Sequence, residues 1–501
     1  MISIHKTHRF ACVLAGLVGA LAALSAASPA ALAHHPPPPR GSGGSTQAQT
    51  PIHTIVTSGG RGAPRPVPAR QASPIRHVVV IYLENHTFDN VLGFWCHANP
   101  GRCPQGGMPA TVTLSNGAVV SPSVAHDTVP EVLHTVASQV AAMDGGKMDG
   151  WQNIPDGSCA AAKGYQCISG YQPAQLPNLI GLARHFAFSD NTFSLNDSES
   201  WASHIAIVSA SQDHFYGDNP PTHHYPPVSG WGCDSGKEAP WMTRNNMVPA
   251  CVPDYSLNPV RYPYGGAFES TPAQPIPTIM DRLQAAGLSW RIYGAPKGAK
   301  GYGTWDICPT FAECLDTSQD ANLVPDAQYL TDARDGTLPA FSVVTPGGSD
   351  FLSACHNGMS MTACDNWAGK LVGAVERSPD WASTAVFITF DDCGCFYDQV
   401  PPPLDPAGKQ EGPRMPLIIV SPYARPRYTD TQATTFAGIL AYTEHTFGLA
   451  PLGVNDAQAY DFSNAFNYSQ LPLKRVPMVH RPLPGSARRI RVTPALANDP
   501  T

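Results

Sequence analysis

The chain has 501 residues, of which 43% are hydrophobic, and its formal net charge is −7. This length suits one large domain or two to three smaller ones, with enough apolar side chains for a substantial core. The acidic balance, without a basic block before the C-terminus, argues against a nucleic-acid partner.

The N-terminus has the pattern of a secretory signal peptide over residues 1–33. A basic start precedes an apolar run over residues 11–27, and Ala31-Leu32-Ala33 is an A-x-A cleavage site. A transmembrane anchor is the alternative, but the run is short, rich in alanine and followed by a cleavage signal. We therefore expect a secreted or periplasmic protein, with a disordered Pro/Gly/Ser-rich tether over residues 34–73 and no later segment able to span a bilayer.

Strand and helix patterns alternate through the rest of the chain, which predicts an α/β fold with a mostly parallel sheet and helices on both faces. We place the catalytic domain at residues 74–468 and a Pro/Arg-rich C-terminal tail at 469–501. Residues 214–275, rich in Pro, Gly, Tyr and Trp, read as an irregular insertion. In chain order, the predicted elements are a strand at 77–83, a helix at 132–143, a helix at 179–184, a strand at 187–190, a helix at 200–212, a helix around 279–286, strands at 290–293 and 340–344, a helix around 367–375, strands at 385–390 and 417–420, and a helix at 436–447.

The cysteines indicate a disulfide framework. Of the 13 cysteines, Cys12 lies in the predicted signal, and the others fall in sequence-adjacent pairs. In an exported protein, disulfide bridges between such pairs close local loops. The alternative is a zinc site, which is disfavoured because the sequence contains no C-x-x-C pair. The sequence leaves three alternatives for Cys393 and Cys395: they pair with each other across one residue, pair with other cysteines or stay free. The predicted bridges are Cys96–Cys103, Cys159–Cys167, Cys233–Cys251, Cys308–Cys314 and Cys355–Cys364.

Two predicted buried strands end in oxygen-bearing side chains. The strand at 77–83 runs into Glu84 and Asn85, and the strand at 385–390 runs into Asp391 and Asp392. Parallel strands bring their carboxyl ends to one edge of the sheet, and adjacent buried carboxylates need a cation. These hard oxygen ligands suit Mg²⁺, Ca²⁺ or Mn²⁺, although phosphate chemistry also uses Zn²⁺ and Fe. Helix caps or salt-bridged strand ends are the alternative.

Ser200 opens the predicted helix at 200–212. A hydroxyl there lies beside free backbone N–H groups and the positive end of the helix dipole, where a phosphate binds and an alkoxide is stabilised. A plain N-cap is the alternative role, and Ser198 and Ser203 are rival candidates.

Three histidines are candidates for donating to a phosphate oxygen, protonating a leaving group or binding a metal: His126, His134 and His356. His134 is expected in the first turn of the helix at 132–143. A solvated side chain is the alternative for each.

Glu84-Asn85-His86-Thr87-Phe88-Asp89 resembles the E-N-x-(S/T)-F-D signature of a phosphoesterase family. That family contains bacterial phospholipases C and secreted acid phosphatases and belongs to the alkaline-phosphatase-like superfamily. The resemblance runs from about Pro74 to Tyr468. Further stretches agree in order: G-K-M-D-G-W at 146–151, D-N-T-F at 190–193, the segment 200–209, D-D-C-G-C-F-Y-D-Q-V-P-P-P at 391–403, and G-P-R-M-P with V-S-P-Y-A over 412–424.

The resemblance implies a three-layer α/β/α sandwich of the alkaline-phosphatase type and a divalent metal ion. Glu131-Val132-Leu133-His134 resembles the family's D-x-x-H, which favours His134 over His126. The implied metal ligands are Glu84, Asn85, Asp391 and Asp392, and the implied catalytic residues are the nucleophile Ser200 with His134 and His356.

The expected function is that of an exported, metal-dependent phosphoric ester hydrolase that acts through a phosphoserine. We expect an acid-phosphatase-like phosphomonoesterase, because the chain ends soon after the region of resemblance. A phospholipase C acting on phospholipids is the alternative. A sulfatase-like enzyme is disfavoured because residues 200–204 do not fit C/S-x-P-x-R, and a non-catalytic, metal-stabilised surface protein is the more remote alternative.

The chain departs from the family pattern at three places. Gln399 replaces a histidine, which puts acid–base or metal chemistry at that position in doubt. Cys395 replaces a glycine beside the implied metal ligands, where two cysteines would stiffen the loop or make it redox-sensitive. Ala202-Ser203 replaces Pro-Asn after the nucleophile, which removes one polar contact to the phosphoryl group.

Overall fold

The computed structural model describes residues 73–221, 230–257, 268 and 271–491. The predicted signal peptide and the predicted tether up to residue 72 lie outside these residues, as does the end of the predicted tail, residues 492–501.

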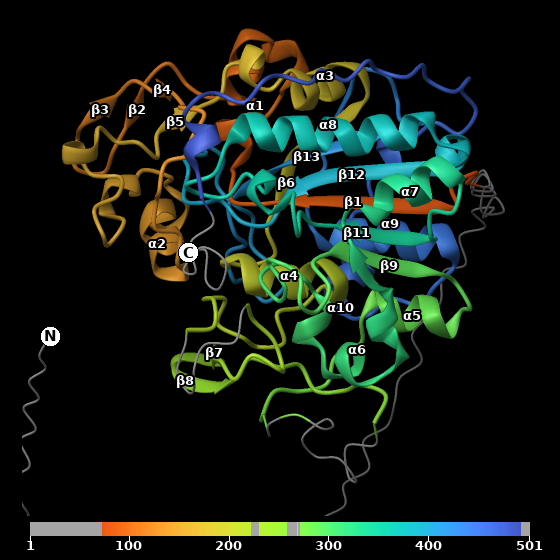
Figure 1. Ribbon diagram of the computed structural model, residues 1–501. Coiled ribbons are helices and arrows are strands. Elements are labelled where there is room, and N and C mark those ends of the chain that lie inside the picture. The colour runs from red at the N-terminus through yellow and green to blue at the C-terminus, as the bar shows by residue number, and fades with distance from the viewer. Residues whose placement is uncertain (1–72, 222–229, 258–267, 269–270, 492–501) are drawn as a thin grey trace, which may run out of the picture. The chain divides into compact units, whose positions relative to one another are not determined.

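A nine-stranded sheet forms the centre of the described part (Figure 1). Its order is β10-β9-β11-β1-β12-β13-β6-β14, and β15 also pairs with β6. The five strands β10, β9, β11, β1 and β12 are parallel to one another, whereas β13 runs antiparallel to both of its neighbours, β12 and β6. The mostly parallel sheet is confirmed. The strands are β1 (His77–Leu83), β6 (Ala187–Phe193), β9 (Trp290–Gly294), β10 (Leu323–Pro325), β11 (Phe341–Val344), β12 (Thr384–Phe390), β13 (Arg414–Val420), β14 (Tyr428–Asp430) and β15 (Thr434–Thr435).

The three central strands β1, β12 and β13 are nearly continuous runs of apolar residues, and almost every side chain in them is buried. This is the composition of strands covered on both faces rather than on one. Figure 1 shows the two covering layers, so the expected three-layer α/β/α sandwich is confirmed. One layer holds α1 (Phe88–Ala98), α3 (Pro177–His185), α7 (Gln328–Asp335) and α8 (Met361–Arg377), and the other α4 (Ser200–Ser209), α5 (Ile279–Ala285), α9 (Ala437–Phe447) and α10 (Val454–Gln458).

Smaller elements lie outside the central sheet. Three two-stranded sheets pair β2 with β3, β4 with β5, and β7 with β8. The hairpin of β7 and β8 belongs to the insertion that was predicted to be irregular. The remaining strands and α-helices are β2 (Val112–Thr113), β3 (Val119–Val120), β4 (Ser123–Val124), β5 (Ser169–Gly170), β7 (Glu238–Trp241), β8 (Thr243–Pro249), α2 (Val136–Met143) and α6 (Ala312–Asp316).

Two predicted boundaries near the site were wrong. The helix expected from residue 132 begins at Val136, because the Thr135 hydroxyl caps it by accepting a hydrogen bond from the Ser138 N–H. His134 therefore precedes the helix instead of lying in its first turn. Asp190, expected at the end of a strand, lies within β6, which continues to Phe193.

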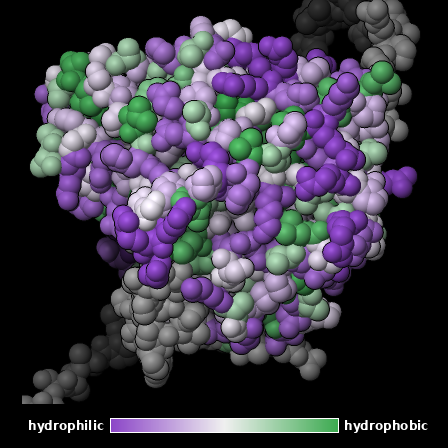
Figure 2. Space-filling model, turned by 45° about the horizontal axis from the view of Figure 1, so that its top comes forward, coloured by the Kyte–Doolittle hydropathy of each residue, from purple (hydrophilic) through white to green (hydrophobic). Residues whose placement is uncertain are grey.

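The predicted C-terminal tail is attached to the sandwich over residues 476–481. The backbone N–H groups of Val476 and Val479 donate to Glu376 on α8 and Asn178 on α3, at 3.0 and 2.7 Å. Figure 2 shows hydrophilic and hydrophobic residues interspersed over the viewed face. Among residues 73–221, 230–257, 268 and 271–491, no helix is both long and apolar enough to cross a bilayer.

All five predicted disulfide bridges are present, which confirms the pairing of sequence neighbours. Cys393 and Cys395 are free thiols, both buried, with their sulfur atoms 3.9 Å apart.

Because both free thiols are shielded from solvent, iodoacetamide is expected to alkylate Cys393 and Cys395 only after the protein has been unfolded. Peptide mass spectrometry with and without denaturant measures this. The cysteines of the five bridges serve as the internal control, since they stay unlabelled in both samples unless a reductant is added. Labelling of the folded protein would contradict the burial of the two thiols.

Candidate active site and metal centre

The ends of β1 and β12 bring four predicted site residues together. The two strands are parallel neighbours with Leu83 opposite Phe390, so Glu84 and Asn85 leave the sheet beside Asp391 and Asp392. The Asn85 backbone N–H donates to Asp391 Oδ1 at 2.8 Å. All four side chains are fully buried. The site thus lies at the carboxyl edge of the parallel strands, the usual place for sites in open α/β sheets.

Ser200, the first residue of α4, faces this cluster. Its Oγ donates to Glu84 Oε2 at 2.9 Å and lies 3.4 Å from both Asn85 Oδ1 and Asp392 Oδ2. The rival serines Ser198 and Ser203 instead hydrogen-bond to each other at 2.6 Å. Among these three hydroxyls, the contacts therefore single out Ser200.

The electrostatics of the cluster fit a divalent cation. Burial, reinforced by neighbouring carboxylates, raises the pKa of Glu84 and of Asp391 to about 8 and that of Asp392 well above its ordinary value. Asp391 Oδ2 is buried without a hydrogen-bond partner among the described residues. Carboxylate, amide and hydroxyl oxygens are ligands of hard divalent cations, which would offset the repulsion between the buried carboxylates.

The raised pKa values predict a pH-dependent effect of metal removal. A folded-state pKa of about 8 for Glu84 and Asp391 means that their contribution to stability is complete below about pH 4 and is lost as the pH rises toward 8. The melting temperature of chelator-treated protein is therefore expected to fall from about pH 5 to pH 8.

Divalent cation should restore the melting temperature more at pH 8 than at pH 5, because the ligands must be ionised to bind it. A cation at 100 times its Kd would stabilise the fold by about 2.7 kcal/mol. Differential scanning fluorimetry with and without cation at several pH values measures this. A cation effect that shrinks with rising pH would contradict the prediction.

His134 orients the Asn85 side chain. The His134 Nδ1–H donates to the Val132 carbonyl at 3.0 Å, so its Nε2 accepts from Asn85 Nδ2–H at 3.2 Å. This contact leaves Asn85 Oδ1 facing Ser200. His126, the other candidate before α2, is exposed.

His356 lies in a loop that is fixed to the strand carrying Glu84. The Glu84 N–H donates to the Ala354 carbonyl at 2.9 Å, and the His356 ring lies 5.9 Å from that of His134. His356 Nδ1–H donates to the Asn357 carbonyl at 2.9 Å, whereas its Nε2 is buried with no partner among the described residues. Burial lowers the pKa of His356 to about 3, so the ring is neutral and its Nε2 carries a free lone pair.

Sequence reasoning missed His204, which also contacts the cluster. His204 Nε2 lies 3.0 Å from Glu84 Oε1 and 3.9 Å from Asp391 Oδ2, and burial lowers its pKa to about 4. These three residues offer ligand atoms within 4.8 Å of one another. The signal was available, because residues i and i+4 of a helix share one face and His204 follows Ser200 by four.

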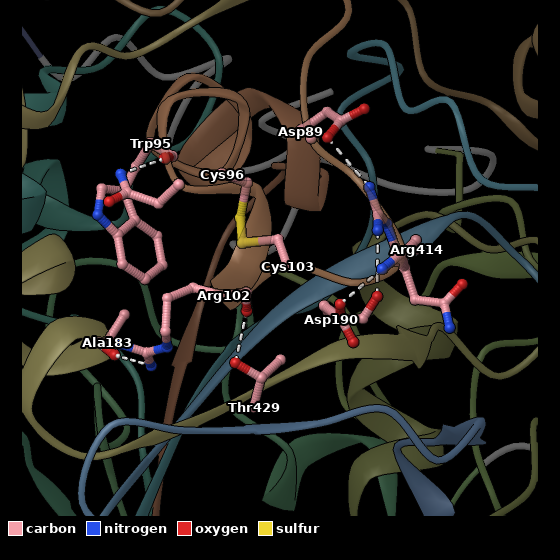
Figure 3. The surroundings of a disulfide bond; sticks show 12 residues. Asp89, Trp95, Cys96, Arg102, Cys103, Ala183, Asp190, Arg414 and Thr429 are labelled. Carbon is pink, nitrogen blue, oxygen red and sulfur yellow. Dashed lines mark hydrogen bonds and ion pairs between the residues drawn. A yellow bond between two sulfur atoms is a disulfide. The ribbon is translucent and has the colours of Figure 1, made fainter.

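A fully buried ion network connects the loops around the site, and Figure 3 shows the part of it in which Arg414 faces Asp89. Arg414 Nε donates to both carboxylate oxygens of Asp398 at 3.0 and 3.1 Å, and its Nη2 donates to Asp89 Oδ1 at 3.0 Å. The Asp89 N–H in turn donates to Asp398 Oδ2 at 3.0 Å. Asp89 follows the Glu84 segment and Asp398 follows the Asp391 segment, so Arg414 holds both ligand-bearing loops in one arrangement.

One departure from the family pattern, Gln399, has a structural explanation. The Gln399 side chain donates to the Gly107 carbonyl at 2.5 Å, which directs it to a neighbouring loop. In the Cys393-Gly394-Cys395 segment, Gly394 packs so closely on Asn85 that a Cβ would lie 2.2 Å from the Asn85 carbonyl oxygen. Gly394 also has φ +52° and donates its N–H to Asp392 Oδ1 at 2.7 Å.

A model of the Phosphoesterase family matches residues 75–450. The chain belongs to the phosphoesterase family. This confirms the resemblance drawn from the motifs, and with it the expectation of a phosphoric ester hydrolase family.

Curated relatives are named as phospholipases C. The chain is 26% identical to the non-hemolytic phospholipase C of Burkholderia pseudomallei over 255 residues, which is 38% of this chain and 36% of that protein. It is 21% identical to phospholipase C A of Mycobacterium tuberculosis over 475 residues, covering 83% of this chain and 82% of that protein. The chain spans about a third of the Burkholderia protein and of a Pseudomonas aeruginosa relative, but most of the mycobacterial one.

Solved structures with detectable likeness include a protein of the alkaline phosphatase superfamily from Vibrio parahaemolyticus, with a TM-score of 0.30 and 12% identity over 55% of this chain and 60% of that one. Human ectonucleotide pyrophosphatase/phosphodiesterase 5 matches with a TM-score of 0.32 and 9% identity over 58% of this chain and 94% of that one.

Proposed function

We propose that this protein is a metal-dependent phosphoric ester hydrolase whose nucleophile is the Ser200 hydroxyl. The observation that carries the proposal is the position of Ser200 Oγ, within 3.4 Å of oxygens from Glu84, Asn85 and Asp392 at the N-terminus of α4. Membership of the phosphoesterase family supports the reaction class.

In this proposal, Glu84, Asn85, Asp391 and Asp392 hold one divalent cation, drawn from Mg²⁺, Ca²⁺, Mn²⁺, Zn²⁺ and Fe. When bound, the cation would lower the pKa of the Ser200 hydroxyl and neutralise charge on the phosphoryl group. The hydrogen bond to Glu84 Oε2 aims Ser200 Oγ into the cluster, and the α4 dipole favours the anionic substrate there.

The proposed reaction uses these side chains as follows. The Ser200 hydroxyl loses its proton to water and its Oγ forms a bond to phosphorus, while the bond from phosphorus to the leaving oxygen breaks and that oxygen takes up a proton. A second water molecule then hydrolyses the phosphoserine, which releases phosphate and returns the proton to Ser200 Oγ. His134 orients Asn85 through its Nε2. His356 contacts the phosphoryl oxygens or the leaving oxygen through its unpartnered Nε2, which takes up a proton beside that anionic group.

Two substrate classes remain candidates for this site. The first candidate is a phosphomonoester. The second candidate, a phospholipid, is supported by the names of the relatives from Burkholderia, Mycobacterium and Arabidopsis thaliana, the last 23% identical over 71% of this chain.

Trapping the covalent intermediate tests both the nucleophile and the substrate class. The metal-loaded protein is mixed with p-nitrophenyl phosphate or with phosphatidylcholine in mixed micelles, quenched in acid and digested for mass spectrometry. We expect a modified Ser200 peptide. A phosphoryl adduct from the monoester identifies a phosphatase, whereas a phosphocholine adduct from the lipid identifies a phospholipase C. Turnover of either substrate with Ser200 unmodified in rapid-quench samples would overturn the proposal, as would the absence of turnover with both, which would favour a non-catalytic protein.

We also propose that the protein is exported after cleavage of residues 1–33, with its catalytic domain at residues 74–468. The five disulfide bridges support export, because such bridges persist in oxidising compartments. N-terminal sequencing of the exported protein is expected to begin at His34, and an intact Met1 on that protein would contradict the cleavage.

A further inference from the structure

We propose that His204 is a positioning residue that fixes the Glu84 carboxylate from the same helix that carries the nucleophile. The inference rests on the proposed metal site. In it, the His204 Nε2–H donates to Glu84 Oε1, which leaves Glu84 Oε2 facing Ser200 Oγ.

The geometry of α4 provides two contacts to one carboxylate. Ser200 and His204 lie one helical turn apart on the same face, and they reach different oxygens of Glu84, at 2.9 Å for Ser200 Oγ and 3.0 Å for His204 Nε2. Both Glu84 oxygens are thereby fixed relative to α4, so the carboxylate cannot rotate without breaking a contact to the helix.

The surroundings of the imidazole hold it in this position. The Tyr82 ring lies 4.8 Å from the His204 ring, and the Tyr82 hydroxyl donates to the Ser203 carbonyl at 3.1 Å. Tyr82 belongs to β1, two residues before Glu84. The strand that supplies the carboxylate is therefore also joined to α4 next to His204, and the His204 side chain is itself only 5% exposed.

Hydrogen-bond chemistry assigns His204 a donor role rather than that of a metal ligand. A carboxylate that binds a cation is ionised and only accepts hydrogen bonds, so the imidazole proton lies on Nε2. The lone pair of that tautomer is on Nδ1, which is not the nitrogen that faces Glu84. Residues that orient a metal ligand in this way typically change metal affinity by about 10–100-fold when they are replaced.

Manganese binding tests the inference independently of catalysis. The free Mn²⁺ signal in electron paramagnetic resonance titrations gives the Kd of the full folded protein and of His204→Ala, His204→Gln and Ser209→Ala. We expect His204→Ala to raise the Kd about 10–100-fold and His204→Gln, which keeps an N–H donor, to restore most of the affinity. Ser209→Ala is the matched control, because it removes a buried hydrogen bond at the other end of α4, where Ser209 Oγ donates to the Ile205 carbonyl at 2.8 Å, and it should bind like the unsubstituted protein.

Pulsed electron paramagnetic resonance of Mn²⁺ bound to the unsubstituted protein separates the two possible roles, even if His204→Ala fails to fold. We expect no directly coordinated imidazole nitrogen. A directly bound nitrogen that disappears in His204→Gln would overturn the donor role, as would a folded His204→Ala variant with unchanged Mn²⁺ affinity. Failure of the unsubstituted protein to bind Mn²⁺, Mg²⁺ or Zn²⁺ would instead overturn the proposed metal site on which the inference rests.

Discussion

Replacing Ser200 with alanine is expected to lower kcat for phosphate ester hydrolysis by about 10⁴-fold or more, the size of effect seen when a catalytic nucleophile is removed. The physical reason is that only Ser200, of these three serines, has its Oγ in contact with the carboxylate cluster. The hydroxyls of Ser198 and Ser203 are hydrogen-bonded to each other instead. Steady-state rates with p-nitrophenyl phosphate and with a phosphocholine ester, at saturating cation, measure the loss.

Ser203→Ala is the matched control for this experiment, because it removes a buried hydroxyl three residues further along the same helix. It is expected to retain activity within about tenfold of the unsubstituted protein, while Ser200→Ala keeps its melting temperature. If Ser200→Ala were as active as Ser203→Ala, Ser200 would not be the nucleophile.

Replacing Arg414 with methionine is expected to destabilise the fold by about 3–5 kcal/mol. Arg414 is the cation of a network with no exposed side-chain surface, and its loss leaves Asp89 and Asp398 side by side without a counter-charge. Burial already raises the pKa of both carboxyls, and the Arg414 guanidinium opposes that rise. Denaturant or thermal unfolding followed by fluorescence measures the change.

The Arg414 prediction has an internal check in the variant that also carries Asp89→Asn and Asp398→Asn. Neutralising the whole network removes the stranded charges, so this variant should be more stable than Arg414→Met alone. An Arg414→Met protein within about 1 kcal/mol of the unsubstituted protein would show that water or protonation compensates the two carboxyls, and that Arg414 does not hold the two loops.

Much of the site was predictable because strand periodicity and strand ends are local features. The apolar runs at 77–83 and 385–390 predicted buried parallel strands, and parallel strands bring their ends to one edge. Glu84 and Asp391 therefore meet as expected. Local patterns predicted the position of His134 less well. Its placement in a helix was wrong, because the helix is capped by Thr135, the residue after His134.

The sequence by itself determined the local features of the site. These are the carboxylates that follow the buried strands, the serine that opens a helix, and the cysteines that are close enough along the chain to form bridges. Only the tertiary structure decided the contacts between segments that are far apart in sequence. These include the amide orientation that His134 imposes on Asn85 and the pairing of Arg414 with Asp89 and Asp398. The physical reason is that a side-chain hydrogen bond or ion pair between distant segments depends on rotamers and packing, which leave no periodic signal in the sequence.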